Sequence, residues 1–245
     1  MKWGEFMYDT RYLTNFQNQM YNNIGYLNSQ NMDNQNKCRC VKSYFRILNA
    51  ITGSPALDVY ANEMLIASNL KYGDFSRYMQ FMPGNYTLSV YISGRQNSAI
   101  FETNITIDRN LAYTGILTGE IADVPNLSVY MIPEAKETYN MNNMAAVKII
   151  HMSPDAPSMD LISDDGTILF SSVEYGDTTD NIALPAGRYI LHLRETKSGE
   201  NILTVPTIDF APRMYYTLFV IGEYGNSPKI LMLVPEDGLN YLDLC

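Results

Sequence analysis

Short runs in which apolar and polar residues alternate recur along the chain and predict β-strands. In residues 86–92 every second side chain is apolar, at Tyr86, Leu88, Val90 and Ile92. A period of two is typical of a strand with one face in a core. Similar runs bounded by Gly, Pro, Asn and Asp predict further strands. They lie at 45–49, 57–61, 64–68, 75–81, 100–107, 113–117 and 127–132 in the first half, and at 147–151, 159–162, 168–172, 179–183, 189–194, 202–208, 215–221 and 230–234 in the second.

The two series of strands belong to an internal repeat. The stretch from His151 to Leu161 aligns with the stretch from Asn49 to Val59 without a gap. Further matches follow in the same order, Tyr72-Gly-Asp74 with Tyr175-Gly-Asp177 and Tyr113-Thr114 with Tyr216-Thr217. Each copy spans roughly ninety residues, the size of a domain rather than of a solenoid repeat.

This repeat predicts an all-β protein with two tandem domains. We expect repeat 1 at residues 43–135, a linker at 136–144, repeat 2 at 145–238 and a C-terminal tail at 239–245. Seven or eight short strands with turn signals every 8–12 residues or so favour an antiparallel β-sandwich over an eight-stranded barrel. Gly73 and Gly176 are expected at turn positions with positive φ.

Residues 1–42 form an Asn/Gln/Tyr-rich segment with few aliphatic side chains. Such a composition buries too little apolar surface to offset chain entropy, so the sequence predicts a disordered tail. It is either inert or an arm for assembly and docking, because amide-rich tracts with aromatic residues tend to associate.

The formal net charge of −9 changes the range of partners that we expect. An acidic body disfavours nucleic acid, which binds basic surfaces. No apolar run approaches the roughly 18 residues of a membrane span. The first residues show no recognisable signal peptide, so we expect synthesis in the cytoplasm, with deposition at a surface or spore layer as one outcome.

Three cysteines, Cys38, Cys40 and Cys245, lie outside the repeats. A Cys-x-Cys pair without a second pair is a weak zinc signal, since a structural site needs four ligands. The thiols are either reduced surface groups or crosslinks to a neighbouring molecule.

The stretch that begins at His151 contains the residues with the most chemical potential. His151, Ser153, Asp155 and Asp160 suggest a hydrolase, but a triad needs groups that converge from separate elements. The first copy has Asn49, Ile51 and Gly53 at three of these positions. We therefore favour a structural loop motif, in which prolines fix the backbone and carboxylates accept backbone N–H groups. Its members are His151, Ser153, Pro154, Asp155, Pro157 and Asp160, with Pro55 and Asp58 in the first copy.

Other candidates have weaker signals. His192 is predicted on the outer face of its strand, where a lone histidine is rarely a ligand. The turn at 164–166 and the loop at 177–180 contain Asp residues that could hold calcium, but neither matches a complete ligand loop. Tyr91 and Tyr130 fall on outward strand positions and could form a patch for protein or sugar.

The residues from His151 to Pro157, the Asp-Leu strand, Tyr175-Gly-Asp177 and residues 184–189 resemble the bacterial family called domain of unknown function 4397. The resemblance covers both repeats, and the second copy fits better. It implies immunoglobulin-like β-sandwiches, often in surface or envelope proteins, with no established activity, cofactor or catalytic residue. We expect a non-enzymatic structural or adhesion protein of a bacterial envelope or spore layer, with protein partners or self-association. The alternative is a small-ligand or glycan-binding module that uses outward tyrosines or acidic loops.

Overall fold

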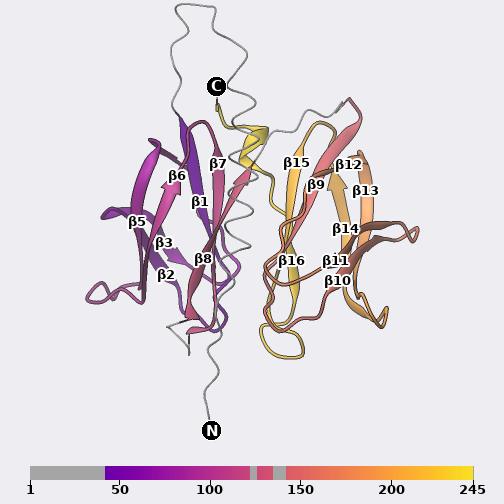
Figure 1. The fold of residues 1–245 in the computed structure, drawn as a ribbon, viewed down its shortest axis with the longest axis horizontal. Helices are drawn as coiled ribbons and strands as arrows, with labels where there is room; N and C mark the ends of the chain where they lie inside the picture. Colours follow the sequence, from indigo (N-terminus) through magenta and orange to yellow (C-terminus); the bar gives the residue numbers. More distant parts are fainter. Residues whose placement is uncertain (1–41, 122–125, 135–141, 245) are drawn as a thin grey trace, which may run out of the picture. The chain divides into compact units, whose positions relative to one another are not determined.

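The structure is a computed structural model that describes residues 42–121, 126–134 and 142–244 (Figure 1). The predictions for the Asn/Gln/Tyr-rich tail, except for its last residue, Lys42, therefore lie outside the described residues. The same is true of Cys38, Cys40 and Cys245.

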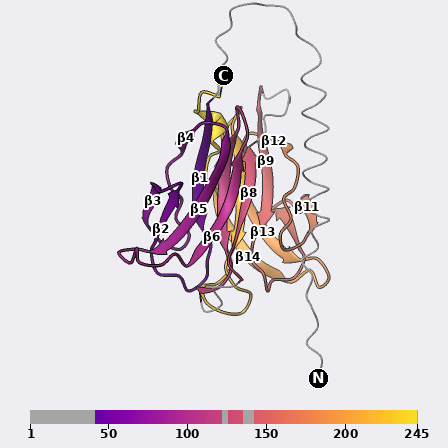
Figure 2. The ribbon, with the colours of Figure 1, turned by 60° about the vertical axis from the view of Figure 1, so that its left-hand side comes forward.

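The first module is a sandwich of two four-stranded sheets, with strand orders β4-β1-β7-β8 and β3-β2-β5-β6. The two layers lie against each other in Figures 1 and 2. The strands are β1 (Ser43–Asn49), β2 (Leu57–Ala61), β3 (Met64–Leu70), β4 (Met79–Phe81), β5 (Gly84–Ile92), β6 (Phe101–Ile107), β7 (Ala112–Thr118) and β8 (Ser128–Glu134).

The second module repeats this topology, with strand orders β12-β9-β15-β16 and β11-β10-β13-β14. Its elements are β9 (Met144–His151), β10 (Met159–Ser163), β11 (Ile168–Val173), β12 (Ile182–Pro185), β13 (Gly187–Glu195), β14 (Asn201–Phe210), β15 (Tyr215–Ile221), β16 (Leu231–Leu233) and the short 3₁₀ helix η2 (Gly238–Asn240). The all-β class and the two repeated sandwiches are as the sequence predicts.

One strand pair in each module departs from the purely antiparallel pairing that we expected. Strand β1 pairs with β7 in parallel, and β9 pairs with β15 in parallel. Parallel neighbours need a crossover connection. Here the intervening strands of the other sheet supply it, because β2, β3, β5 and β6 lie between β1 and β7 in sequence.

The strands predicted at 75–81 and 179–183 are shorter than expected, for the same reason in both modules. The Ser76 hydroxyl accepts the backbone N–H of Ile47 at 2.9 Å, and the Thr179 hydroxyl accepts that of Ile149 at 3.1 Å. A side-chain hydroxyl thus takes the place of one backbone acceptor at the start of each edge strand, while the N–H groups of Ser76 and Thr179 still donate to the Ile47 and Ile149 carbonyls. Regular pairing begins only in β4 and β12.

Each sandwich encloses its own apolar core. The alternation in β5 and β13 is confirmed, since Leu88, Val90, Leu191 and Leu193 are fully buried. These residues belong to two separate clusters, one for each module. Burying a side chain of this size contributes roughly 1.5–3 kcal/mol.

In the first core, Gly115 packs directly against the ring of Phe45. A Cβ at this position would lie 2.7 Å from the Phe45 ring, closer than real contacts allow. At the aligned positions, the second module has the smaller Val147 and the larger Leu218, both buried. The exchange keeps total volume similar, which is how cores tolerate sequence change.

A third apolar cluster joins the two modules. It contains Leu48, Ala50, Ile116, Ile132, Ile150, Met152, Phe219 and Ile221, all buried, from β1, β7, β8, β9 and β15 or the residues that follow them. The Phe75 and Phe219 rings meet edge to face, with centroids 5.4 Å apart. Strands β1 and β7 are therefore buried on both faces, one toward their own core and one toward the other module.

Candidate functional site

The loop after β9 is organised by His151. The backbone N–H of Ser153 donates to His151 Nδ1 at 3.2 Å, and Nε2 lies 3.4 Å from the Pro157 carbonyl oxygen. The ring is fully buried, and burial lowers its pKa, against the opposing effects of Pro157 and Asp177. His151 is therefore a neutral ring that holds the loop.

The backbone of His151 is held by the Tyr-Gly-Asp turn that the repeat also retains. Gly176 N–H donates to the His151 carbonyl at 2.8 Å, and His151 N–H donates to the Asp177 carbonyl at 3.1 Å. In the first module Gly73 and Asp74 make the same two bonds with Asn49. Both glycines have positive φ, as expected.

The other polar groups of the loop also contact backbone atoms. Ser153 Oγ donates to the Gly222 carbonyl at 2.7 Å, and Asp155 accepts the N–H of Tyr224 at 2.9 Å. We expected Asp155 to accept from its own turn, but its donor lies 69 residues away, in the loop after β15. His151, Ser153 and Asp155 do not form a nucleophile, base and orienting group.

Asp58 and Asp160 stabilise an irregularity in the edge strands. Asp58 accepts the N–H of Asn69 at 2.9 Å, and Asp160 accepts that of Ser172 at 2.8 Å. Both donors have positive φ, 52° and 54°, an uncommon conformation for residues other than glycine. The donors are in β3 and β11 rather than in the proline-containing loop that the sequence suggested.

Pro154 and Asp155 are exposed at the tip of the loop, whereas Pro157 is half-buried and bonded to His151. Pro55, the counterpart of Pro157, is exposed in the first module. His192 lies on the outer face of β13, half-buried, with Nδ1 3.0 Å from the Thr204 hydroxyl. No group of three or more His, Cys, Asp or Glu side chains within the described residues is placed to bind a metal ion.

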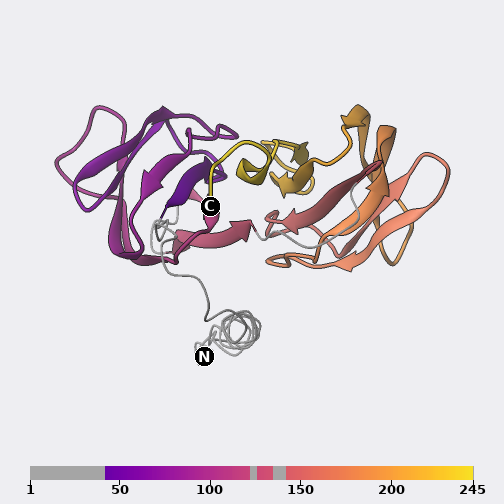
Figure 3. The same ribbon diagram turned by 90° about the horizontal axis from the view of Figure 1, so that it is seen from above.

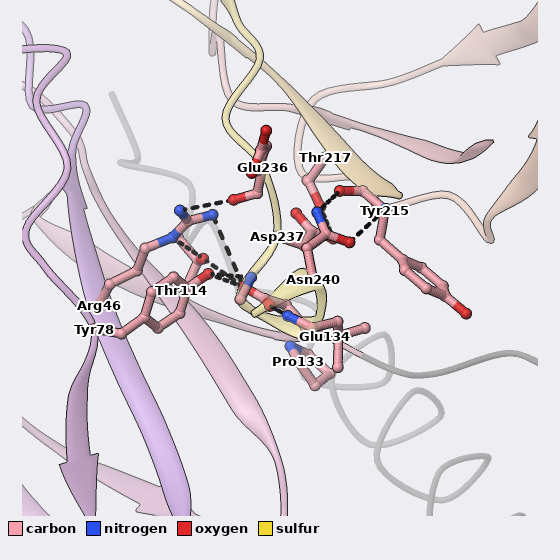
Figure 4. A network of polar contacts seen from close by, with 12 residues as sticks. Arg46, Tyr78, Thr114, Pro133, Glu134, Tyr215, Thr217, Glu236, Asp237 and Asn240 are labelled. Carbon is pink, nitrogen blue, oxygen red and sulfur yellow. Dashed lines mark hydrogen bonds and ion pairs between the residues drawn. The ribbon is translucent and has the colours of Figure 1, made fainter. Parts of the chain in front are cut away.

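A polar network crosses between the modules beside the third apolar cluster (Figure 4). Arg46 on β1 donates to Thr114 Oγ1 at 2.8 Å and pairs with Glu134 at 3.8 Å. Its guanidinium lies 4.7 Å from the Phe75 ring centroid and 4.5 Å from that of Tyr78. Arg46 and Glu134 are both about 95% buried or more, and a cation on an aromatic face gains stability when desolvated.

The second module supplies the matching half of this network. Lys148 on β9 aligns with Arg46 and donates to the Pro133 carbonyl at 3.1 Å. Thr217 aligns with Thr114 and donates to Asp237 at 3.0 Å. Burial, together with the charge of Glu134, raises the pKa of Asp237 to about 6, and Lys148 opposes this shift.

Residues 239–244 belong to the segment that the sequence analysis assigned to a C-terminal tail, and several residues of this region contact the first module. Gly238 N–H donates to Tyr78 Oη at 3.2 Å, and Leu239 N–H donates to Glu134 at 3.3 Å. Tyr241 packs edge to face on Tyr78, with ring centroids 6.1 Å apart. The segment, yellow in Figure 3, thus contacts residues of the first module.

The charged residues of this network were not predicted, although the sequence carries a signal for two of them. Arg46 and Lys148 interrupt apolar runs at the same position in both copies, and a solvent-facing sheet position would explain them equally well. Tyr130 was expected on an outward patch, but it packs against the third apolar cluster. Tyr91 does lie outward, beside Tyr60 on the first module.

Comparison with known proteins identifies a family. The family model described as domain of unknown function DUF4397 matches residues 43–143 and 145–240. No curated protein matches the sequence. No helix within the described ranges has the length and apolar character needed to span a bilayer.

Two solved structures match the chain at low similarity. The Bacillus anthracis TIE protein is 10% identical over 75% of this chain, with a TM-score of 0.24, and the chain spans 34% of its length. A family 26 carbohydrate-binding module from Eubacterium rectale Amy13K, solved with maltoheptaose, is 10% identical, with 80% and 97% of the two chains covered and a TM-score of 0.26. Likeness this low says nothing about what the chain binds.

Proposed function

The chain belongs to the DUF4397 family, whose description assigns no activity, and we propose from its own geometry that it is a non-enzymatic structural unit for adhesion or assembly. In this proposal the two sandwiches act as one rigid body. The setting is a bacterial envelope or spore layer, with self-association or protein partners.

The joined inner sheets carry this proposal. The third apolar cluster and the buried network use one face of β1, β7, β9 and β15, so these strands have no free face left for a ligand. Large apolar contacts of this kind resemble a core rather than a transient domain contact, and they restrict motion between modules. A unit whose two modules do not move against each other presents its outer surfaces in a fixed arrangement, which suits assembly into a layer.

The chemistry of the His151 loop supports a role without catalysis. A general base must present an unengaged nitrogen to a substrate. His151 Nδ1 already accepts from Ser153 N–H, and the ring is buried. The Ser153 hydroxyl is likewise held by the Gly222 carbonyl.

The terminal segments are the proposed means of association. The amide-rich tail is suited to docking, and Cys38, Cys40 and Cys245 could link neighbouring copies by disulfides in an oxidising layer.

Fractionation of cells that carry the native gene tests the proposal. We expect the full chain in the envelope or spore-layer fraction, with extraction promoted by a reductant. In parallel, the purified chain and the His151→Ala variant are screened against broad hydrolase substrates. A soluble chain with turnover that disappears in a folded His151→Ala variant would contradict the proposal.

A further inference from the structure

A groove of about 720 Å³ lies on the outer face of the β3-β2-β5-β6 sheet in the first module. Its strand residues, including Tyr60 and Tyr91, alternate with core residues such as Val59 and Val90, so they point away from the sandwich interior. Small-molecule sites in proteins are typically about 300–1,000 Å³. The volume of this open groove lies within that range.

Two tyrosines form its aromatic part. The Tyr60 and Tyr91 rings stand at 85° to each other, with centroids 5.5 Å apart. Gln96 Nε2 donates to Tyr60 Oη and helps to hold that ring. Both side chains are half-buried, so ring surface remains open to solvent. An aromatic face is electron-rich and attracts the polarised C–H bonds of a ring packed on it.

The polar atoms around these rings include both donors and acceptors. Asn62 Oδ1 accepts the N–H of Thr87 at 2.7 Å, which fixes the amide and leaves its Nδ2 hydrogens for a ligand. Glu102 accepts from Ser89 Oγ at 2.8 Å through one oxygen and keeps the other. Glu63 also lines the groove and is exposed.

Glu63 occupies a backbone position that does not favour it. Asn62 and Glu63 are the two central residues of the β2–β3 hairpin, with φ of 44° and 68°. Turns with positive φ at both positions prefer Asn followed by Gly. The second module has a glycine, Gly166, at a positive φ in its own hairpin. A strained non-glycine residue of this kind is common at functional sites.

The second module shows that the fold does not require these side chains. Where the first module has Tyr60 paired with Ser89, the second has Ile162 paired with His192. The position of Tyr91 is taken by Arg194, opposite the equivalent aspartate. The aromatic pair is therefore particular to one copy.

We propose that this groove binds an uncharged oligosaccharide, with a sugar ring packed on Tyr60 or Tyr91. Sugar hydroxyls both donate and accept, which matches the mixture of amide donors and carboxylate acceptors. The two glutamates, which form no ion pair within the described residues, disfavour an anionic ligand. A cationic ligand would use the carboxylates but would make no use of the Asn62 donors, whereas a sugar hydroxyl can accept from them. The site goes beyond the assembly role and does not depend on it.

Isothermal titration calorimetry of the full chain tests this site. The probes are maltohexaose, cellohexaose, laminarihexaose and chitohexaose, with hexalysine and oligogalacturonate as charged comparisons. At least one neutral probe is expected to bind, and Tyr91→Arg, which copies the second module, should weaken it by about tenfold or more, as for loss of an aromatic anchor.

Glu63→Gly separates binding from folding. Glycine relieves the positive φ, so this variant should melt at the same temperature or higher, yet it should bind about three- to tenfold more weakly, as expected for a lost hydrogen bond. Asn110→Gly, at a φ of 60° outside the groove, is the matched control and should not change affinity.

The proposed oligosaccharide site would be contradicted if no neutral probe bound at roughly 10 mM, a concentration far above that of ordinary recognition. It would also be contradicted if hexalysine bound more tightly than every neutral probe. The third contradicting result is unchanged binding in both Tyr91→Arg and Glu63→Gly. Each of these leaves the assembly proposal standing, because neither variant touches the joined inner sheets.

Discussion

Asn49 and His151 occupy equivalent positions and make the same hydrogen bond. Asn49 Oδ1 accepts the N–H of Ile51 at 3.1 Å, and His151 Nδ1 accepts the N–H of Ser153 at 3.2 Å. Each acceptor serves the residue two positions further on, at the start of a proline-containing loop. The histidine ring therefore accepts in the second module the backbone N–H that an amide oxygen accepts in the first.

This equivalence predicts the effect of exchanging the residues. The free energy of unfolding of His151→Asn should lie within about 1 kcal/mol of that of the natural chain, because an acceptor for the Ser153 N–H remains. His151→Ala should cost about 1–3 kcal/mol, since a buried donor loses its partner. Urea denaturation of both variants measures the difference. Equal losses in the two would show that the ring contributes by packing rather than by its nitrogen.

The buried histidine also predicts a dependence on pH. The pKa of His151 in the folded chain lies below its ordinary value of 6.5, because burial disfavours the imidazolium. As pH falls below about 6.5 the unfolded chain binds a proton that the folded chain resists, so stability is lost down to the folded pKa. Above that range the group has no effect.

The contribution of His151 is isolated by comparison with His151→Asn. Asp237 acts in the opposite sense between about 6 and its ordinary 3.8, because its raised pKa makes the folded chain take up a proton. Both proteins contain Asp237, so this effect cancels in the difference. The free energy of unfolding should fall more steeply between pH 6.5 and 5 in the natural chain. If the free energy of unfolding depended on pH in the same way in both proteins, the lowered pKa of His151 in the folded chain would be contradicted.

The phase of β13 predicts opposite results for two adjacent residues. Leu191 is fully buried, and Leu191→Ala should cost roughly 2–5 kcal/mol through lost burial and a cavity. His192 lies on the outer face, and His192→Ala should stay within about 0.5 kcal/mol. Thermal unfolding compares them. Because the third apolar cluster joins the two modules, the loss in Leu191→Ala should lower the whole transition rather than one module alone.

The strands were predictable because each sandwich imposes a period of two that local sequence records directly. The packing of the two modules against each other was not predictable in this way. Residues 45–50 carry apolar side chains on both faces, which indicates a strand covered twice, but only the tertiary arrangement shows that Ile150 and Phe219 provide the second cover. Arg46 was missed because a charged residue in a strand ordinarily faces water.

Only one of the two tyrosines of the groove could be predicted from the sequence. Alternation placed Tyr91 outward, whereas its neighbour Tyr60 comes from another strand and reaches it through the register of β2 with β5. That register follows from which face is buried and cannot be read from either strand alone. The role of Glu63 depends on its positive φ, which a two-residue turn imposes.

The buried ion pair predicts a large effect of a single charge. Arg46→Leu leaves Glu134 buried without its cation and should cost about 3–5 kcal/mol. Lys42→Ala removes one partner of the exposed Lys42–Asp243 pair, which water screens, and should leave the stability of the chain nearly unchanged. Chemical denaturation of the two variants measures both. If Arg46→Leu were as mild as Lys42→Ala, the network would be solvated and the modules would not be tightly joined.

Differential scanning calorimetry tests most directly whether the two sandwiches are one rigid unit. For a single cooperative transition the van't Hoff enthalpy equals the calorimetric enthalpy, whereas two independent modules of similar size give a ratio of van't Hoff to calorimetric enthalpy of about 0.5. The shared cluster around Phe219 and the Arg46–Glu134 pair predict one endotherm with a ratio near one. Phe219→Ala, which removes a ring from the joint, should lower this ratio. Two separate endotherms, or a ratio near one half in the natural chain, would contradict the account.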